Sequence, residues 1–272
     1  LELTPVRADS KSRYKKITIN RQAVDEFFVD VFVRSYDKAP VQIIIDLDAT
    51  DDIIHGNQSG RFFHGYYGNY CYLPLYIFCG EHLLCARLRP SDIDASAGSV
   101  KELERIVAQI RQNWPDVHII IRGDSGFCRE QIMQWCEDNK VDYVLGLAKN
   151  ERLTTELAQE LLQAKSQYEQ TGSAARIFRD FTYQTLKSWS NSRRVVGKAE
   201  YLDKGQNPRF IVTSLLQDQY DARLLYEDLY CGRGDMENRI KEQQLCLFAD
   251  RTSAATMRAN QLRLWFSSVA YT

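Results

Sequence analysis

The sequence predicts an α/β fold in which helices cover the faces of a mixed β-sheet. Three apolar runs of strand length, rich in β-branched residues, lie at residues 41–48, 116–121 and 141–147, and segments with helical periodicity separate them. Strands that alternate with helices usually pair in parallel. Two further strands, at residues 70–78 and 82–88, are joined by a tight turn and form an antiparallel hairpin. The sheet should therefore contain both kinds of pairing.

The other segments of the first half follow from composition and periodicity. Residues 1–20 are polar and basic, and we interpret them as a strand remnant or a frayed end. Apolar residues recur at helical spacing in residues 21–36, 99–112 and 129–139, which predicts three amphipathic helices. Residues 50–69 contain four glycines and are expected to form a long loop.

The second half changes character twice. Residues 151–170 predict a helix that Gly172 stops, and residues 175–215 are rich in Arg, Thr, Tyr and Val, which predicts an inserted β-meander. Helical periodicity returns at about residue 219. We therefore expect an N-terminal strand and helix remnant (1–39), the first part of a core (40–150), a helix and β-strand insertion (151–218) and truncated C-terminal core helices (219–272).

Composition excludes several classes of protein. Among 272 residues, 44% are hydrophobic and 26% charged, as in ordinary globular domains. The formal net charge of -1 argues against a basic nucleic-acid coat but allows a local basic groove. The seven cysteines form no CxxC pair and are expected to be buried free thiols. The four histidines are not spaced with them as zinc ligands.

No membrane segment is expected, because the chain has neither a run of about 18 apolar residues nor a signal peptide. The chain begins with Leu1 and ends at Thr272, just after an apolar helical run. Both ends look cut, so we expect a piece of a longer polypeptide, with a DNA-reading domain upstream.

A polar stripe marks the start of the helical region near residue 230. Tyr230, Arg233, Glu237 and Lys241 are spaced so that they share one face of a helix. One carboxylate thus lies among a phenol and two cations. Such a carboxylate can hold a metal ion while its neighbours hold phosphate.

Two aspartates far upstream complete the pattern. Asp48 and Asp124 each end a predicted core strand, and sites in open α/β sheets form at the carboxyl ends of strands. Carboxylate oxygens suit Mg²⁺, and two ions about 4 Å apart can clamp the oxygens of an in-line phosphoryl transfer. Asp46 points to the same side of its strand as Asp48. We prefer Asp48, which is nearer the strand end, and assign Asp46 a supporting or structural role.

An alternative interpretation starts from the segment Asp46-Leu-Asp48-Ala-Thr50. It resembles the DxDxT motif of haloacid dehalogenase-type phosphatases, with Asp46 as nucleophile and Asp48 as general acid. The second acid expected four residues after Asp124 is instead Cys128. This alternative also leaves Glu237 and its stripe unexplained.

From about residue 40 to its end, the chain resembles bacterial insertion-sequence transposases of the DDE type, DDE transposase group 1. The most specific element is Y-x-x-R-x-x-x-E at residues 230–237, and the segments at Asp124 (RGDSGF) and Asp48 (DAT) add to it. The resemblance implies a ribonuclease H-like mixed sheet flanked by helices, with a β-rich insertion before the last catalytic helix. It also implies that Asp48, Asp124 and Glu237 are the catalytic and metal-binding triad.

The resemblance also implies how DNA is held. Tyr230 and Arg233 would contact phosphate near the cut. Members of the family often carry a lysine seven residues after the glutamate, where this chain has Gln244, and Lys241 is expected to replace it. In the insertion, Trp189 beside Arg193 and Arg194 would form a stacking platform for an unpaired base, with phosphate contacts alongside; the alternative is a Trp that packs a hairpin beside solvated arginines.

The expected activity is cleavage of transposon ends followed by strand transfer. Two Mg²⁺ ions, which Mn²⁺ can replace, would serve as cofactors. The expected partners are double-stranded DNA and a second copy of the chain in a homodimer, in the cytoplasm of a bacterium, at the nucleoid. His55 and His64 either reach the metal site or satisfy loop backbone groups. A second alternative is an inactive, truncated remnant that only binds DNA.

Overall fold

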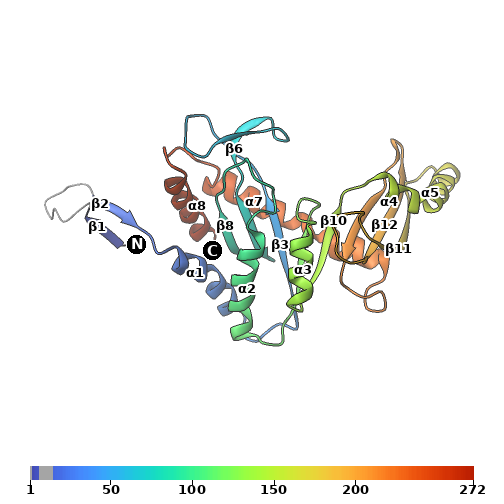
Figure 1. Cartoon of the computed structure of the whole chain (residues 1–272), viewed down its shortest axis with the longest axis horizontal. Coiled ribbons are helices and arrows are strands. Elements are labelled where there is room, and N and C mark those ends of the chain that lie inside the picture. The colour runs from blue at the N-terminus through green and yellow to red at the C-terminus, as the bar shows by residue number, and fades with distance from the viewer. Residues whose placement is uncertain (1, 6–14) are drawn as a thin grey trace.

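The computed structural model describes residues 2–5 and 15–272 (Figure 1). Near the N-terminus, β1 (Glu2–Pro5) pairs antiparallel with β2 (Lys15–Thr18). We expected residues 1–20 to be a strand remnant or a frayed end, and the structure has strands at Glu2–Pro5 and Lys15–Thr18. Residues 1 and 6–14 lie outside the described residues. The expected first helix follows as α1 (Arg21–Arg34), and the Asn20 side chain caps it by accepting a hydrogen bond from Ala23 N.

A nine-stranded mixed sheet forms the centre of the molecule, with eight strands in the order β11-β12-β14-β10-β9-β3-β7-β8 and β13 paired to β12. β3 pairs in parallel with β9, and β9 with β10, whereas β3, β7 and β8 are antiparallel neighbours. This confirms the predicted α/β class with a mixed sheet, and it is compatible with a ribonuclease H-like fold. These core strands are β3 (Gln42–Ala49), β7 (Leu75–Cys79), β8 (His82–Arg87), β9 (His118–Gly123) and β10 (Asp142–Leu147).

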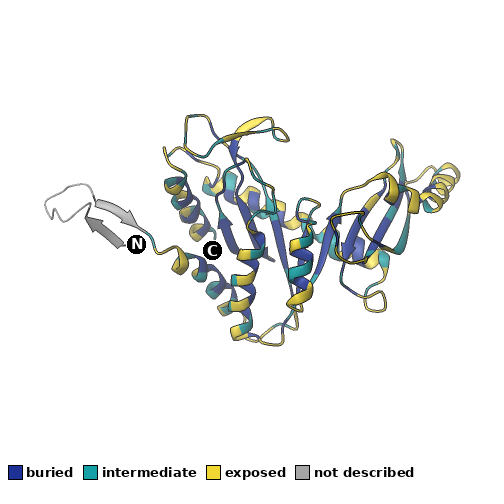
Figure 2. Ribbon diagram, in the orientation of Figure 1, coloured by how far each residue is buried: buried dark blue, intermediate teal, exposed yellow. Residues whose placement is uncertain are grey.

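Two predicted helices cover one face of this sheet. They are α2 (Ser99–Asn113) and α3 (Glu130–Asp138), within one residue of the predicted bounds, and Figure 1 shows both beside the core strands. Residues from α1, α2 and α3 join the strands in the largest hydrophobic cluster. The strands between the helices are mostly buried (Figure 2).

The two faces of β3 have different surroundings because side chains alternate along a strand. Ile45 and Leu47 point into the large cluster on the side of α1, α2 and α3. Ile44 packs against a smaller cluster on the opposite side, and by alternation Asp46 and Asp48 share that side. The acidic residues therefore face the C-terminal helical segment.

The predicted loop at residues 50–69 contains short strands instead. β4 (Asp52–Ile53), β5 (Phe62–His64) and β6 (Asn69–Tyr72) form a separate three-stranded sheet of order β4-β6-β5. The single strand predicted at residues 70–78 is thus divided between two sheets. Pro74 lies at the division, and its missing backbone N–H prevents a continuous ladder.

The helix predicted at residues 151–170 is also divided. α4 (Glu151–Glu156) and α5 (Ala158–Thr171) meet at Leu157, and Gly172 ends α5 in the left-handed conformation with φ 65°. The predicted meander is present as β11 (Ala175–Tyr183), β12 (Arg193–Leu202), β13 (Gly205–Gln206) and β14 (Arg209–Thr213). It extends the central sheet, because β14 pairs antiparallel with β10.

The C-terminal region is helical, as predicted, but it is not uniform. Asp221 caps a short α6 (Ala222–Leu224), which continues as a π-helical segment, η1 (Leu225–Tyr230), and a 3-10 segment, η2 (Cys231–Arg233). These lead into α7 (Gly234–Leu247), and α8 (Met257–Tyr271) completes the chain. Tyr230 therefore ends a π-helical segment and does not begin the helix. π-Helical turns occur frequently at functional sites.

The cysteines and the apolar segments are the features for which composition made an expectation. All seven cysteines are free thiols, but Cys231 and Cys246 are exposed, so the expectation of burial is wrong for these two. Among the described residues, no helix combines the length and the apolar character that a membrane span requires.

Candidate active site

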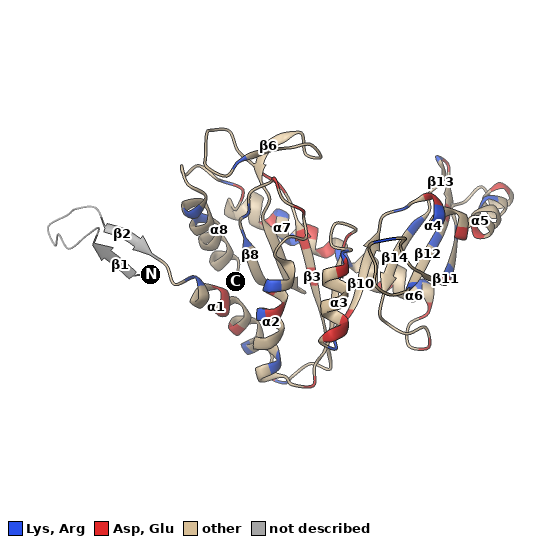
Figure 3. Cartoon of the chain, in the orientation of Figure 1, with Lys and Arg blue, Asp and Glu red and all other residues tan. Residues whose placement is uncertain are grey.

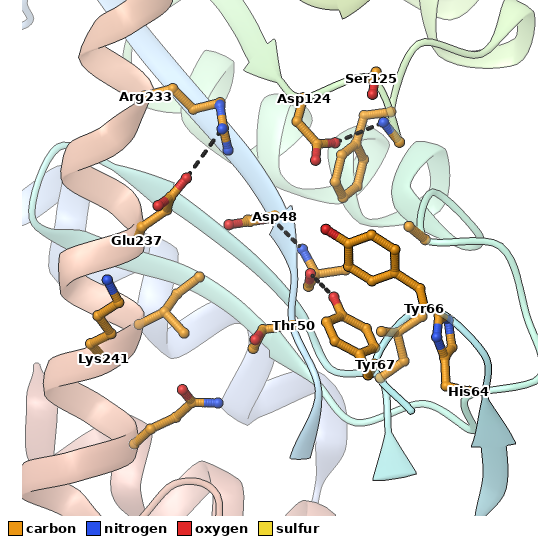
Figure 4. A pocket seen from close by; sticks show the side chains of 17 residues that line it. Asp48, Thr50, His64, Tyr66, Tyr67, Asp124, Ser125, Arg233, Glu237 and Lys241 are labelled. Carbon is orange, nitrogen blue, oxygen red and sulfur yellow. Dashed lines mark hydrogen bonds and ion pairs between the residues drawn. The ribbon is translucent and has the colours of Figure 1, made fainter. Parts of the chain in front are cut away.

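Asp48, Asp124 and Glu237 line one cavity of about 690 Å³ at the carboxyl ends of the parallel strands (Figure 4). We call it the acidic cavity. Asp48 lies near the end of β3, Asp124 follows β9 and Glu237 belongs to the first turn of α7. The structure therefore brings together three carboxylates that are far apart in the sequence.

The pairing of β3 with β9 explains why two of these acids are neighbours. In the parallel register Asp46 is opposite Arg122 and Leu47 is opposite Gly123. The next residues along the chain are Asp48 and Asp124, respectively, so these two acids lie at the same end of the neighbouring strands. Asp124 is held by its own turn, where Gly126 N donates to Asp124 Oδ1 at 2.8 Å. A Cβ atom at Gly126 would lie only 2.9 Å from that oxygen, so the tight turn favours glycine.

Asp48 lies in an environment that strongly disfavours its ionised form. Burial raises the pKa of Asp48 to about 6, the Arg233 guanidinium opposes this shift, and the negative charges of Asp124 and Glu237 add to it. The Ala49 backbone N–H donates to Asp48 Oδ1 at 2.8 Å. A cation bound beside this carboxyl group would stabilise its ionised form, which burial and the neighbouring carboxylates disfavour.

Asp46 has a different environment although it shares the face of Asp48. Its side chain accepts two hydrogen bonds from Arg122, at 2.5 Å from Nε and 2.7 Å from Nη2, and it does not line the acidic cavity. The third guanidinium nitrogen, Arg122 Nη1, donates to the Leu229 carbonyl at 2.5 Å. A Cβ at Gly232 would lie 2.8 Å from this nitrogen. The pair therefore links β3 and β9 to the helical segment that carries Glu237.

The predicted polar stripe divides between two cavities. Arg233, Glu237 and Lys241 line the acidic cavity, and Arg233 Nη2 lies 3.1 Å from Glu237 Oε1 (Figure 4). Tyr230 lies on the other side of Asp124, in a smaller cavity, and burial raises its pKa. Its hydroxyl occupies the space beside Gly146, where a Cβ would lie 2.5 Å from the oxygen. Gly146 thus permits the close approach of the phenol.

Gln244, which stands where a lysine was expected, also lines the acidic cavity. Its amide nitrogen donates to Asp52 Oδ1 at 3.2 Å. Asp52 is fully buried, and burial raises its pKa to about 8, with Gln244 opposing the shift. Lys241 is exposed at the cavity and is the lysine of this helix face that can reach a ligand.

The structure does not bring Trp189, Arg193 and Arg194 to the acidic cavity. The Trp189 ring is 7% exposed and packs edge-on against Tyr183, at 5.8 Å between ring centroids. Arg193 pairs with Glu130 at 2.7 Å and with Glu137 at 2.6 Å, and Arg194 pairs with Asp180 at 2.6 Å. The expected exposed platform is therefore not what the structure shows, and DNA contact by these three residues stays a prediction without geometric support.

Sequence reasoning missed two tyrosines of the cavity. Tyr66 is 88% exposed, and Tyr67 donates through its hydroxyl to the Ala49 carbonyl at 3.2 Å (Figure 4). They follow β5, in the segment predicted as loop, and the adjacent pair of tyrosines was the available signal. His64 lines the same cavity, whereas His55 lines a different one beside Asp51 and Asp250.

The side chains do not form a ready metal site as they stand. Within residues 2–5 and 15–272, no group of three or more His, Cys, Asp or Glu side chains is arranged to hold an ion. The donor chemistry nevertheless fits a hard divalent cation, because three carboxylates face one cavity. Glu237 is paired with Arg233, so an ion shared with Asp48 and Asp124 would compete with the guanidinium for this carboxylate.

Comparison with known protein families gives one result. The family described as transposase DDE domain group 1 matches residues 6–272. A comparison with curated proteins finds no match to this chain.

Proposed function

The chain belongs to the family of transposases with a DDE domain of group 1, and we propose that it cleaves transposon ends and joins them to target DNA by in-line phosphoryl transfer. Transposases of this family act on DNA and use divalent metal ions. The proposed catalytic and metal-binding residues are Asp48, Asp124 and Glu237. The observation that carries the proposal is their presence in one cavity, although they come from two strand ends and a helix.

We assign the carboxylates to binding two divalent ions, Mg²⁺ with Mn²⁺ as a substitute. When bound, such ions supply positive charge to the attacking and leaving oxygens of a phosphodiester. Burial, together with the charges of Asp124 and Glu237, raises the pKa of Asp48 to about 6, so cation binding would relieve the repulsion among these groups.

Arg233 and Lys241 are proposed to hold phosphate of the strand that is cut. Both line the acidic cavity, and burial, which by itself lowers the pKa of Arg233, is outweighed by Tyr230 and by the carboxylates of Asp48, Asp124 and Glu237, so that this pKa is raised. If Glu237 turns toward an ion, the guanidinium is free to donate to a phosphate oxygen. Tyr230 is proposed to contact phosphate from the other side of Asp124.

The phosphatase alternative lacks geometric support. A nucleophilic Asp46 must reach its substrate, but this side chain is 4% exposed and both of its oxygens are bound to Arg122. The proposed partners are double-stranded DNA at the element ends and target, and a second copy of the chain in a homodimer that holds two ends. The proposed location is the nucleoid of a bacterial cell.

Cleavage of a DNA duplex that carries the terminal repeats flanking the gene tests this proposal. We expect strand cleavage with Mg²⁺ or Mn²⁺ and none with EDTA. The variants Asp48→Asn, Asp124→Asn and Glu237→Gln should lower the cleavage rate by at least about 100-fold, consistent with loss of an essential metal ligand. Glu242→Gln, an exposed residue of the same helix, is the matched control and should cleave normally. Binding without cleavage by the parent chain would favour the inactive remnant, and cleavage by Glu237→Gln would refute the proposed triad.

A further inference from the structure

A second cavity, of about 160 Å³, lies on the side of Asp124 that faces the β insertion. Asp124 and Ser125 line both this cavity and the acidic cavity. Lys149 and Arg209 also line the second cavity, together with Tyr226 and Tyr230. We call it the basic cavity.

The antiparallel pairing of β10 with β14 places the two cations next to each other. Leu147 is opposite Phe210 at the end of this pairing. Lys149 follows two residues after Leu147, and Arg209 immediately precedes Phe210. Lys149 follows the core strand β10, and Arg209 begins β14 of the insertion. Each therefore contributes one positive charge to the cavity beside the turn that carries Asp124.

Among the residues that the structure describes, Lys149 and Arg209 differ from most cations of the insertion in having no carboxylate partner. Lys and Arg residues are spread over β11 and β12 (Figure 3), and ion pairs with carboxylates hold Arg176, Arg179, Arg193, Arg194 and Lys198. Lys149 and Arg209 are exposed. Within the described part of the chain, neither side chain makes an ion pair or a hydrogen bond, so both can bind a ligand without losing an existing partner.

The size and lining of the basic cavity limit what can enter. Its volume is below the roughly 300–1,000 Å³ of pockets that enclose drug-sized molecules, so it suits a single phosphate group better than a whole nucleotide. The carboxylate of Asp124 at one end would repel an anion on its own. Two cations in the same lining offset that repulsion, and the Tyr230 hydroxyl adds a hydrogen-bond donor.

We propose that Lys149 and Arg209 bind a backbone phosphate of the DNA strand next to the phosphate on which the acidic cavity acts. This inference rests on the proposed function and extends it from the core to the insertion. Asp124, shared by both cavities, would lie between two successive phosphates of one strand. The insertion would then position the strand by phosphate contacts, which fix register without reading base sequence.

The first test measures binding of a fluorescent end duplex by anisotropy at several salt concentrations, with Lys149→Gln and Arg209→Gln. We expect each variant to weaken binding about fivefold or more and to reduce the salt slope by about one. Lys204→Gln, which removes an exposed cation of the insertion outside the basic cavity, is the matched control and should bind as the parent does. Thermal unfolding of each variant checks that the fold is retained.

The second test locates the phosphate. Duplexes in which one phosphate at a time is replaced by a neutral methylphosphonate are bound by the parent chain and by the Lys149→Gln/Arg209→Gln double variant. At one position next to the cut, we expect the replacement to weaken duplex binding by the parent chain but not by the double variant. Independent sites would not show this coupling. Equal losses at every position, or variants that bind as the parent does, would overturn the inference. A parent chain that neither binds nor cleaves DNA would instead refute the proposed function.

Discussion

Asp46 and Arg122 form a buried, two-point ion pair between the neighbouring strands β3 and β9, with oxygen-to-nitrogen distances of 2.5 and 2.7 Å. Their exposed fractions are 4% and 8%. Arg122 also reaches the Leu229 carbonyl in η1. This one contact joins the strand that carries Asp48, the strand that precedes Asp124 and the helical segment that leads to Glu237.

Removal of one partner of this pair should destabilise the protein strongly. Asp46→Ala leaves a buried guanidinium without its carboxylate, and such losses cost about 3–5 kcal/mol. We expect this drop in the free energy of unfolding, measured with urea. The double variant Asp46→Leu/Arg122→Met should recover part of it, because no unpaired charge remains. A phosphatase that used Asp46 as nucleophile would instead keep its stability and lose activity, so normal stability of Asp46→Ala would contradict our assignment.

Gly146→Ala should disturb the proposed site from a position that carries no functional group. Its Cβ would lie 2.5 Å from the Tyr230 hydroxyl and 2.9 Å from Ser125 N, so the phenol or the Asp124 turn must move. We expect at least a tenfold loss of cleavage, since small displacements of reacting groups are costly. The matched control is Gly234→Ala on α7, where a Cβ meets no atom within 4 Å.

The variant Tyr230→Phe shows whether the Gly146→Ala substitution displaces the Tyr230 phenol or the Asp124 turn. Tyr230→Phe removes the hydroxyl that the new methyl group would meet. If the phenol is what moves, Gly146→Ala/Tyr230→Phe should cleave no worse than Tyr230→Phe alone. A further loss in the double variant would instead assign the effect to the Asp124 turn.

Asp52 should make stability depend on pH. Burial raises its pKa to about 8, and Asp51 and Asp250 add to the shift against Gln244. The folded state therefore holds the proton more tightly than the unfolded state, whose pKa is about 3.9. The free energy of unfolding should consequently fall as pH rises from about 4 to about 8.

Asp52→Asn tests this dependence, because the amide cannot ionise. We expect a flatter profile of unfolding free energy between pH 5 and pH 8, and a variant more stable than the parent at pH 8, by an amount on the order of a few kcal/mol. Asp218→Asn, an exposed control, should keep the slope of the parent. A parent profile that rises with pH in this range would show that Asp52 is ionised in the folded state.

Trp189→Ala should act on stability and not on DNA. The ring packs against Tyr183 and Arg193, and loss of a buried Trp side chain costs about 3–5 kcal/mol. We expect a lower midpoint of thermal unfolding and, at temperatures where the variant is folded, unchanged affinity for a duplex with an unpaired end base. A selective loss of that affinity in a fully stable variant would restore the stacking role first expected for this residue.

The local pattern of residues was enough to predict the elements around the site. β-Branched runs predicted the core strands, and the spacing of the Tyr230 stripe placed Arg233, Glu237 and Lys241 on one helix face, which lines the acidic cavity. The same apolar runs placed Asp48 and Asp124 at strand ends. These features depend only on residue type and on periods of 2 and 3.6, which short segments carry by themselves.

Only the tertiary structure decided which side chains meet neighbours far along the chain. Asp46 and Asp48 lie on one side of a strand, and the sequence favoured Asp48 only by its place nearer the strand end; the structure shows Asp46 bound to Arg122 and Asp48 lining the cavity. Burial of Trp189 depends on its packing against β11, and the shared cavity of Lys149 and Arg209 depends on the pairing of β14 with β10. Sequence fixes which side chains are available, whereas long-range packing fixes which of them meet, because strand partners and burial are set by residues distant in the chain.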